Sequence, residues 1–377
     1  MPAEVAALAG FPDGFGRGPG ETDALLLLRC LLGPTPRSLH ALIWGTGSAS
    51  HALARIRGGG AGSDNDRAFL ASTDVGEIRR SLDRAGARFA APGDPDYCPA
   101  FLRLADPPVG VFARGRVLGH GDDRVAVVGS RRPTATGMEV AADLGRGLAV
   151  AGVVTVSGGA VGIDAAAHRG ALDAGGVTVA VLGSGIDIAH PARNRDLFEQ
   201  IEASGTVMSE YPPGTSAEPF RFPARNRLIA ALSRGVVVVE GAAKSGTRIT
   251  AEHAVDLGLD VFAVPGPVTS PLAETPLGLI RDGATMIRGT ADLLEDLGLE
   301  GGAWGERGVP RGLSADERRI LASLGTSMLP TAVAGATGMP VADALTVLIA
   351  LELRGLVRGV GGRFERTFKA AHSGSGG

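Results

Sequence analysis

The chain has few of the residues on which redox, metal-binding and membrane functions commonly depend. Cys30 and Cys98 are the only cysteines among 377 residues, so cysteine alone supplies neither a disulfide framework nor a zinc site. A reducing cytoplasm is therefore the expected location. No basic residue precedes Arg17, which argues against a secretory signal. No run of about 18 apolar residues occurs, so no membrane insertion is expected.

Aromatic residues and lysine are also scarce. Aromatics make up 4% of the chain, and only two of its 37 basic residues are lysine, one of them Lys244. The net charge of −3 argues against a protein that is basic all over but allows a local basic patch. The 44% apolar and 20% charged residues are typical of a soluble globular protein, and the 58 glycines predict many turns.

From Val125 onward, short apolar strands alternate with helical stretches. Strands this rich in Val, Ala and Leu predict a parallel sheet covered on both faces, in an α/β, Rossmann-like doubly wound domain. The expected strands are Val125–Val128, Val153–Val156, Val177–Leu182, Thr206–Met208, Val236–Val239 and Asp260–Val264. The expected helices are Gly137–Ala149, Asp164–Ala174, Asn194–Ala203, Arg227–Leu232 and Thr250–Leu257.

Helical patterns flank this region on both sides. Near the N-terminus Thr22 is a candidate N-cap for a helix over Ala24–Leu32, and Gly58–Asp66 is expected to be a loop. After a Gly-rich linker, Ser314 caps the first of three short helices, and a hairpin with a glycine turn completes the outline of a winged helix. The predicted parts are a flexible N-terminus 1–21, a helical (SAM or helix-hairpin-helix-like) domain 22–85, the Rossmann-like domain 86–297, a linker 298–312, a winged-helix-like domain 313–370 and a disordered tail 371–377.

Two polar loops follow the first strands of the expected sheet. Gly129-Ser130-Arg131-Arg132 comes after the first strand, at a switch-point position where amides and a guanidinium could hold phosphate. The alternative is an ordinary turn with solvated arginines. The segment is not G-x-G-x-x-G, so no dinucleotide cofactor is expected. Ser157-Gly158-Gly159-Ala160 follows the second strand, where paired glycines let a ligand approach the backbone.

Three further groups of residues carry candidate chemistry. Asp164 and His168 are four apart on one helix face, but no nucleophile or third ligand accompanies them, so a structural hydrogen bond is favoured over acid–base catalysis. No metal site and no catalytic residue are predicted.

Arg195 and Phe198 share a face, which suits a phosphate and a stacked base, and equally suits a surface arginine and a core phenylalanine. Arg225-Asn226-Arg227 is interpreted as a basic turn.

A P-loop-like segment follows the fifth of these strands. Lys244-Ser245-Gly246-Thr247 resembles part of a P-loop, but Ala243 stands where the motif requires glycine. ATP hydrolysis is therefore unsupported, and a simpler anion-binding turn remains. Glu240, at the end of the strand, is expected to pair with a loop amide or a basic residue.

Taken together, these motifs resemble the DNA-processing protein A (DprA/Smf) family. The resemblance covers most of the chain and rests on segments that occur in the family's order: VAVVGSRRP, VSGGAVGIDAAAH, TVAVLGSGID, HPARN, SEYPPGT, FPARNR, VVVVEGAAKSGTRITAEHA and VFAVPGP. The chain departs from the usual family pattern at Val161, where members carry arginine, and at His190, where they carry tyrosine. Thr275-Pro276-Leu277 replaces a Gly-Thr-Asn.

The resemblance implies a cytoplasmic, non-enzymatic protein that binds single-stranded DNA without cutting it. It also implies protection of incoming DNA, loading of a RecA-type recombinase during natural transformation and recombination, and self-association as a homodimer. Single-strand-binding protein is a further candidate partner, and no cofactor is implied. By motif position, the family's DNA contacts fall on Arg131, Gly158, Gly159, Arg195, Phe198, Asn226 and Arg227.

The sequence therefore predicts a groove for single-stranded DNA. Arginines would bind phosphates, the Gly158 and Gly159 amides would add anion contacts, and Phe198 would stack a base. The predicted DNA-binding residues are Arg131, Arg132, Gly158, Gly159, Arg195, Phe198, Arg225, Asn226, Arg227, Lys244, Ser245, Gly246 and Thr247.

Two alternative functions remain open at this point. One is a nucleotide hydrolase of the phosphoribohydrolase type, although Glu252 follows Gly246-Thr247 five residues on, where that class needs three. The other is a winged-helix regulator that uses Arg363 and Arg366 on its wing. The same C-terminal segment is at least as compatible with a protein-interaction module.

Overall fold

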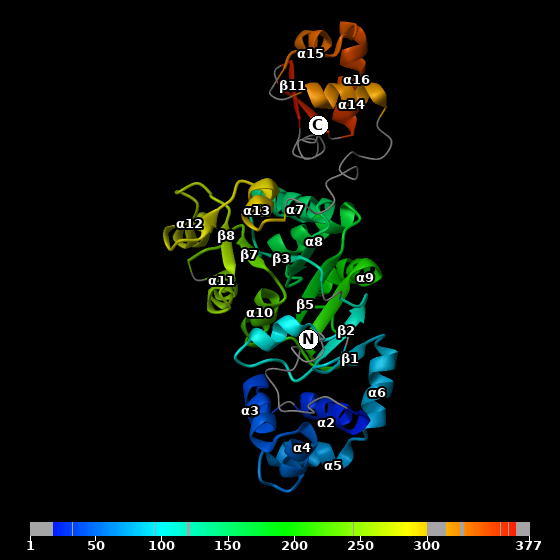
Figure 1. Cartoon of the computed structure of the whole chain (residues 1–377), viewed down its shortest axis with the longest axis vertical. Helices are drawn as coiled ribbons and strands as arrows, with labels where there is room; N and C mark the ends of the chain where they lie inside the picture. Colours follow the sequence, from blue (N-terminus) through cyan, green and yellow to red (C-terminus); the bar gives the residue numbers. More distant parts are fainter. Residues whose placement is uncertain are drawn as a thin grey trace. The chain divides into compact units, whose positions relative to one another are not determined.

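The computed structural model shows two compact units, Met1–Leu297 and Gly298–Gly377 (Figure 1). It describes residues 18–31, 33–94, 96–118, 121–243, 245–299, 314–324, 328–354, 356–360 and 362–366. Most of the predicted flexible N-terminus, the linker and the whole predicted tail lie outside the described residues. The predicted boundary after residue 85 stays a prediction, because both segments that it separates belong to the first unit.

The first unit is built on a nine-stranded, mostly parallel sheet with the order β1-β2-β6-β5-β4-β3-β7-β8-β9. Every neighbouring pair from β6 to β9 is parallel, and only β1 and β2 run antiparallel to their neighbours. This confirms the Rossmann-like fold class. The strands are β1 Arg88–Ala90, β2 Val111–Gly115, β3 Arg124–Val128, β4 Val154–Ser157, β5 Thr178–Gly185, β6 Thr206–Tyr211, β7 Gly235–Val238, β8 Asp260–Ala263 and β9 Thr285–Met286.

Helices cover both faces of the sheet. From β3 to β6 the chain moves steadily toward one edge, and after β6 it returns to β7 and continues toward the other edge. Right-handed crossovers then put α7, α8 and α9 on one face and α10, α11 and α12 on the other, with α13 packed on α7 (Figure 1). The helices are α7 Ala135–Val150, α8 Ile163–Asp173, α9 Arg195–Ser204, α10 Arg221–Ala231, α11 Gly246–Asp256, α12 Glu274–Arg281 and α13 Thr290–Asp296.

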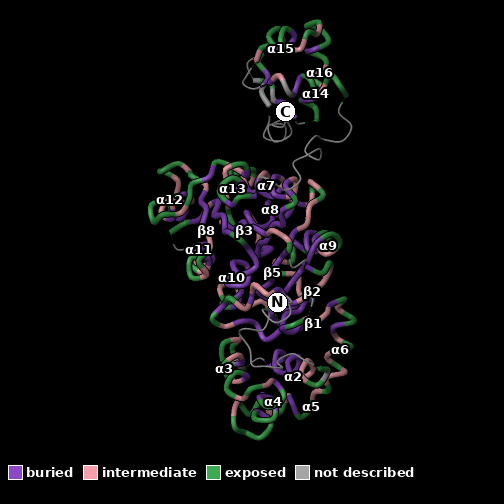
Figure 2. The backbone as a smooth tube through the Cα atoms, in the orientation of Figure 1, coloured by how far each residue is buried: buried purple, intermediate pink, exposed green. Residues whose placement is uncertain are grey.

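The chain reversal makes β3 the switch point of the sheet. β3 lies between β4 and β7, so the loops that leave these three strands emerge side by side at their carboxyl ends. Open α/β sheets bind ligands at this place. The central strands are buried on both faces, as Figure 2 shows in purple, which explains their near-continuous apolar sequence.

The N-terminal helices differ from the prediction at two places. The first begins at Pro19, with Gly18 as N-cap, because proline suits the first helical turn, so Thr22 is not a cap. A further helix begins at Asp64, inside the predicted loop, where Ser63 and Asp66 form a capping box. The helices here are α2 Pro19–Cys30, α3 Pro36–Thr46, α4 Ala49–Arg57, α5 Asp64–Ser72 and α6 Val75–Arg84, and short 3-10 turns η1 Pro99–Arg103, η2 Ala192–Asn194 and η3 Pro271–Ala273 occur later in the chain.

The C-terminal unit has the predicted three helices and a hairpin. Ser314 caps the first helix through a capping box with Glu317, as its sequence predicted. Met328 joins the hairpin by two backbone hydrogen bonds to Phe364. In the described part of the chain no single helix is long and apolar enough to cross a membrane, although α15 and α16, which meet at a bend of 109°, pass that test as a pair. The elements are α14 Ala315–Ser323, α15 Pro330–Thr337, α16 Val341–Leu353, β10 Val357–Val360 and β11 Arg363–Arg366.

Helices α7 and α8 approach each other unusually closely. A Cβ atom on Gly170 would lie 1.9 Å from the carbonyl oxygen of Ala142, and one on Gly145 would lie 2.0 Å from that of Ala167. Only glycine permits this contact between the two backbones. By contrast, a Cβ on Gly278 in α12 would meet nothing within 4 Å.

We predict that Gly170→Ala destabilises the protein by about 1–3 kcal/mol, because the added methyl group must push the two helices apart. Gly278→Ala, the matched control, is expected to be neutral or to stabilise by roughly 0.4–1 kcal/mol, since it adds helix propensity in open space. Urea denaturation of both variants measures the difference. Equal stability of the two variants would show that the helix contact is not constrained.

His168 lies buried between α8 and the sheet. Its Nδ1 donates a hydrogen bond to Thr178 Oγ1 at 2.7 Å, because the Thr178 hydroxyl proton is itself donated to the carbonyl oxygen of Thr155. Nε2 is buried without a partner. Burial, with a smaller contribution from Arg225, lowers the pKa of His168 to about 3. The imidazole is therefore neutral in the folded protein at ordinary pH.

This burial predicts a loss of stability in mild acid. The pKa of His168 is lower in the folded chain (about 3) than the ordinary value of 6.5, so the unfolded chain binds a proton that the folded chain excludes. The contribution of His168 to the free energy of unfolding should be complete above pH 6.5 and fall as pH drops toward 3. Between roughly pH 7.5 and 5 this group alone should lower the free energy of unfolding by about 2 kcal/mol. His168→Asn keeps an N–H for Thr178 and should lose that part of the pH dependence. The exposed His51→Gln control should follow the wild-type chain, and an unchanged pH dependence in His168→Asn would contradict the assignment.

Candidate nucleic-acid interface

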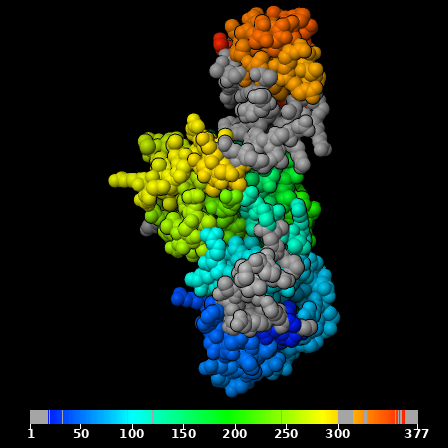
Figure 3. Space-filling view, viewed as in Figure 1, coloured from blue at the N-terminus to red at the C-terminus, as the bar shows by residue number. Residues whose placement is uncertain are grey.

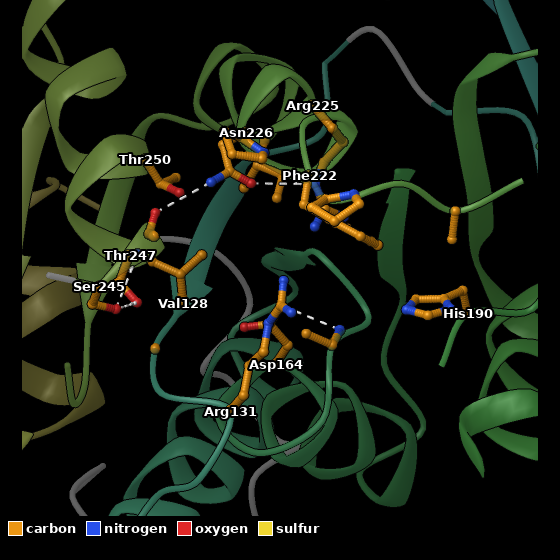
Figure 4. A pocket seen from close by; sticks show the side chains of 17 residues that line it. Val128, Arg131, Asp164, His190, Phe222, Arg225, Asn226, Ser245, Thr247 and Thr250 are labelled. Atoms are coloured by element: carbon orange, nitrogen blue, oxygen red, sulfur yellow. Dashed lines mark hydrogen bonds between the residues drawn. The ribbon is translucent and has the colours of Figure 1, made fainter. Parts of the chain in front are cut away.

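The carboxyl ends of the strands around the switch point surround a cavity of about 500 Å³. Figure 4 shows its labelled side chains, with Ser245 and Thr247 at the left and His190 at the right. Six of the predicted DNA-binding residues line it: Arg131, Arg225, Asn226, Ser245, Gly246 and Thr247. A recess of about 60 Å³ shares several of these residues and adds Gly158. Residues from four separate segments thus meet at one place, as their positions after parallel strands predicted.

Glu240 organises the loop that follows β3. Its carboxylate accepts hydrogen bonds from the Thr134 backbone N–H at 2.9 Å and the Thr134 hydroxyl at 2.6 Å, and its carbonyl oxygen accepts one from the Ser130 N–H at 2.7 Å. This confirms the predicted pairing of Glu240 with a loop amide. These bonds hold the loop against the end of β7, and the side chains of Arg131 and Arg132 remain exposed.

The Arg131 guanidinium lies over an aromatic ring at the cavity. Its Cζ atom is 5.1 Å from the centre of the Phe222 ring, within the range of a cation–π contact. The His190 ring packs on the same phenylalanine with a centroid distance of 5.3 Å. These three side chains come from three different segments and line the cavity together.

The loop that follows β4 is held by two buried charges. Asp164 accepts hydrogen bonds from the N–H groups of Gly158 at 3.1 Å and Ala160 at 3.3 Å. Arg225 donates to the carbonyl oxygen of Gly158 at 2.7 Å and to that of Val181 in β5. The Gly158 amide therefore already has an acceptor within the protein, and the predicted anion contact through this amide is wrong for this conformation.

Phe198 lies in the core and does not face the cavity. Its side chain is 5% exposed and belongs to the apolar cluster under α9. A Cβ on Gly159, which has a φ of 64°, would lie 2.4 Å from the Phe198 ring, so the glycine gives the ring room. Of the two interpretations the sequence left open, the core phenylalanine is the one found, and the predicted base stacking on Phe198 is not supported. Gly159 is buried against it.

Arg225-Asn226-Arg227 forms part of helix α10, so the predicted basic turn is wrong. Pro223 is compatible with the helix because it lies in the first turn, where no backbone N–H is needed. Arg225 and Arg227 are only 4% and 6% exposed. The two therefore cannot form a solvated basic wall.

Arg225 and Arg227 of α10 have different surroundings. Arg227 Nη2 donates to both carboxylate oxygens of Glu210 at 2.9 and 2.8 Å, and Asp106 lies 3.4 Å from its Nε, so its charge is neutralised inside the protein. Arg225 lines the cavity. Burial lowers the pKa of Arg225 to about 10, an effect that nearby Asp164 partly offsets, and the guanidinium stays protonated at neutral pH.

The beginning of α11 contributes hydroxyl groups to the cavity. Ser245 is the N-cap of this helix, and its hydroxyl oxygen accepts the Thr247 N–H at 3.2 Å. Asn226 Nδ2 donates to the carbonyl oxygen of Gly246 at 3.3 Å, which ties α10 to this helix start. Thr250, one turn further, also lines the cavity. Lys244 lies outside the described residues.

Two predicted arginines lie on the surface beyond the cavity. Arg132 and Arg195 are exposed and are not among the residues that line it. Asp164 and His168 do not form the pair that their spacing allowed, because Asp164 bonds loop amides and His168 bonds Thr178. In the described ranges no cluster of His, Cys, Asp and Glu side chains could hold a metal ion.

The sequence did not identify Phe222, His190 and Thr250 as site residues. In the sequence, His190 stands out only as a departure from a family pattern. One signal was present for Phe222, since it lies beside the charged segment in a chain with very few aromatics. Thr250 lies one helical turn from Gly246, so its place beside the helix start follows once the helix is known.

Comparisons with known proteins agree with this fold. The chain matches the family model of DNA recombination-mediator protein A over residues 88–298 and that of the DprA winged helix domain over residues 306–363. It is 38% identical over 337 residues to a putative DNA processing protein DprA of Mycobacterium tuberculosis, covering 82% of this chain and 85% of that protein. It is 36% identical over 290 residues to Protein Smf of Escherichia coli, covering 73% and 76%.

Two solved structures are similar to this chain. DNA processing protein A of Streptococcus pneumoniae has a TM-score of 0.64 and 32% identity, over 74% of this chain and 98% of that one. DNA processing protein A of Helicobacter pylori, solved to explain its single-stranded DNA binding mode, has a TM-score of 0.51 and 28% identity, over 57% and 98%. The motifs, the sheet and the comparisons agree, and the chain belongs to the DNA recombination-mediator protein A (DprA/Smf) family.

Proposed function

We propose that this chain binds single-stranded DNA across the cavity at the switch point of its sheet. The observation that carries the proposal is the Arg131 guanidinium, exposed at the cavity and lying over the Phe222 ring. A strand needs a cation for its phosphates and an apolar, flat surface for its bases, and this pair supplies both. The relative from Helicobacter pylori binds single-stranded DNA, which agrees with the proposal.

The cavity suits a nucleotide in size and chemistry. Its volume of about 500 Å³ lies in the range of small-ligand sites. Phe222 and His190 offer aromatic surfaces to a base. Across the cavity, the Ser245 and Thr247 hydroxyls and the N-terminus of α11 favour an anion, because the helix dipole is positive there. A phosphate can thus be held from two sides, by Arg131 and by the start of α11.

Exposed arginines continue this path outside the cavity. Arg132 follows Arg131 directly, and Arg195 begins α9, which follows β5, the second strand from β3 in the sheet. Contacts of this kind bind phosphates whatever the sequence of the strand. Arg225 acts differently in our proposal. It positions the loop after β4 against strand β5 and adds positive potential beneath the cavity.

We further propose that the bound strand is passed to a RecA-type recombinase in natural transformation and recombination, and that the chain works as a homodimer. Membership in the DprA/Smf family supports both steps. The role is non-enzymatic in this proposal, because Asp164 accepts hydrogen bonds from loop amides and His168 is buried against Thr178.

We predict that Arg131→Ala weakens binding to a single-stranded oligonucleotide by roughly tenfold, because a charge-assisted phosphate contact is lost. The slope of log affinity against log salt should fall by about 0.7, the value for one phosphate on a single strand. Fluorescence anisotropy over a salt series measures both. Arg319→Ala, which removes an equally exposed arginine from α14 in the C-terminal unit, is the matched control and should bind like the wild type.

The same titration with a duplex oligonucleotide completes the test. We expect single strands to compete far better than duplex, since stacking on Phe222 needs unpaired bases. Wild-type affinity in Arg131→Ala, or a salt response that is flat, would overturn the proposed site.

Recombinase loading can be tested separately. We predict that the chain accelerates assembly of a RecA-type recombinase on single strands already coated with single-strand-binding protein, measured by the recombinase's DNA-dependent ATPase. Arg131→Ala should accelerate it less, and Arg319→Ala as much as the wild type. A wild-type chain that binds the strand yet leaves the assembly rate unchanged would refute loading and leave strand binding intact.

A further inference from the structure

Helix α16 of the C-terminal unit exposes a row of large apolar side chains. Val341, Leu345, Ile349 and Leu353 are 46%, 38%, 45% and 85% exposed. They follow one another at intervals of four residues, so they form one continuous ridge along the helix. The opposite side of α16 is buried in the core of the unit, where it packs on α14 and α15. The unit forms a packed body of its own, coloured orange in Figure 3, and Figure 2 marks much of α16 as exposed.

Almost no charge interrupts this ridge. Between Val341 and Leu353 only Asp343 and Glu352 are charged. The Glu352 carboxylate accepts the Gly359 N–H at 2.8 Å, so it is tied to the hairpin. The solvent-facing side of a helix is normally polar. A helix that is apolar on both its buried and its exposed side therefore has a second apolar surface that its own fold does not cover. The exposed side of α16 therefore has the character of an interface.

Nucleic acid is not a suitable occupant for this side. In helix-turn-helix proteins the recognition helix enters the major groove and is accompanied by cations that bind phosphate. α16 is the third helix of the unit and carries no lysine or arginine between its ends, and Arg354, which follows it, pairs with Glu317 at 2.8 Å. A strongly charged protein partner is equally unsuited, since the ridge offers it no opposite charge.

The shape of the ridge suits a second copy of itself. Ala342, Thr346 and Ala350 run beside the large residues at the same spacing and leave a shallow groove next to the ridge. When ridges with a spacing of four residues pack into such grooves, the two helices cross at about −50°. Ridge and groove lie on the same helix, so two identical helices related by a twofold axis satisfy each other. We propose that the exposed side of α16 docks against α16 of a second copy of this chain.

The size of the contact predicts its strength. A helix of 13 residues is about 20 Å long and about 10 Å wide. That footprint is small beside the roughly 800 Å² that each partner buries in a standard interface. The contact should therefore be reversible and depend on concentration when it acts alone, and it should add avidity to any other contact between two copies.

Engineered disulfides in the full-length chain test the proposal. Leu345 and Ile349 lie on either side of the middle of the ridge, so a twofold contact in which the two helices run antiparallel brings Leu345 of one copy opposite Ile349 of the other. We expect a mixture of Leu345→Cys and Ile349→Cys chains to form covalent dimers on mild oxidation, because a disulfide needs Cα atoms within about 7 Å. The native Cys30 and Cys98 are buried and serve as the background. The control mixture replaces Ile349→Cys by Ala315→Cys, at an exposed position on α14.

A second variant separates association from folding. Leu345→Glu places a charge on the ridge at an exposed position, so the fold should persist, while Ala315→Glu adds the same charge on α14. In sedimentation velocity over a concentration series, Leu345→Glu should lower the fraction of associated chains at least about threefold and Ala315→Glu should not. Binding of single-stranded oligonucleotide should be equal in both variants, which keeps this test independent of the DNA site.

Three results would overturn the proposal. The test mixture could form no more covalent dimer than the control mixture. Leu345→Glu could associate like the wild type. Cross-linking could fail while Leu345→Glu abolishes binding to lipid vesicles of neutral phospholipid, which would assign the ridge to a membrane surface instead of a second copy.

Discussion

The buried guanidinium of Arg225 is the interaction on which the geometry of the site depends. It extends from α10 to the carbonyl oxygens of Gly158 and Val181, so one side chain joins a helix to two neighbouring strand ends. The Asp164 carboxylate accepts hydrogen bonds from two amides of the loop after β4. A buried charge is costly unless it is paired and hydrogen-bonded, so these groups hold each other in place. The position of the cavity follows from that arrangement.

Much of the fold and the location of the site could be predicted from sequence, because both depend on patterns that repeat along the chain. Apolar runs separated by helical stretches gave the parallel sheet, and the polar loops after those runs gave the edge where ligands bind. Glu240 could also be interpreted correctly, since a carboxylate at a strand end beside loop amides has few other partners. The two antiparallel strands β1 and β2 were missed, because three to five residues of mixed character carry almost no periodic signal.

What the sequence could not give was the direction of individual side chains. Arg225 and Arg227 lie two residues apart on α10, hence on different sides of it, and the partner of Arg227 is Glu210 on β6, the strand before this helix. Nothing local distinguishes such an arginine from a solvated one. Phe198 shows the same limit, since its spacing from Arg195 fixes a shared face and says nothing about which part of that face the core covers.

The closed loops have a consequence for how fast the protein can capture a strand. The amides of Gly158, Ala160 and Thr134 already have carboxylate acceptors, so the loops after β3 and β4 need not become ordered when DNA arrives. Association at such a preorganised surface is governed by diffusion and by the attraction of the arginines for phosphate, with no folding step in between. In the proposed mode of binding, the residues that touch DNA are distinct from those that hold the loops. Exchange of an exposed arginine can then tune affinity while the architecture beneath it stays the same.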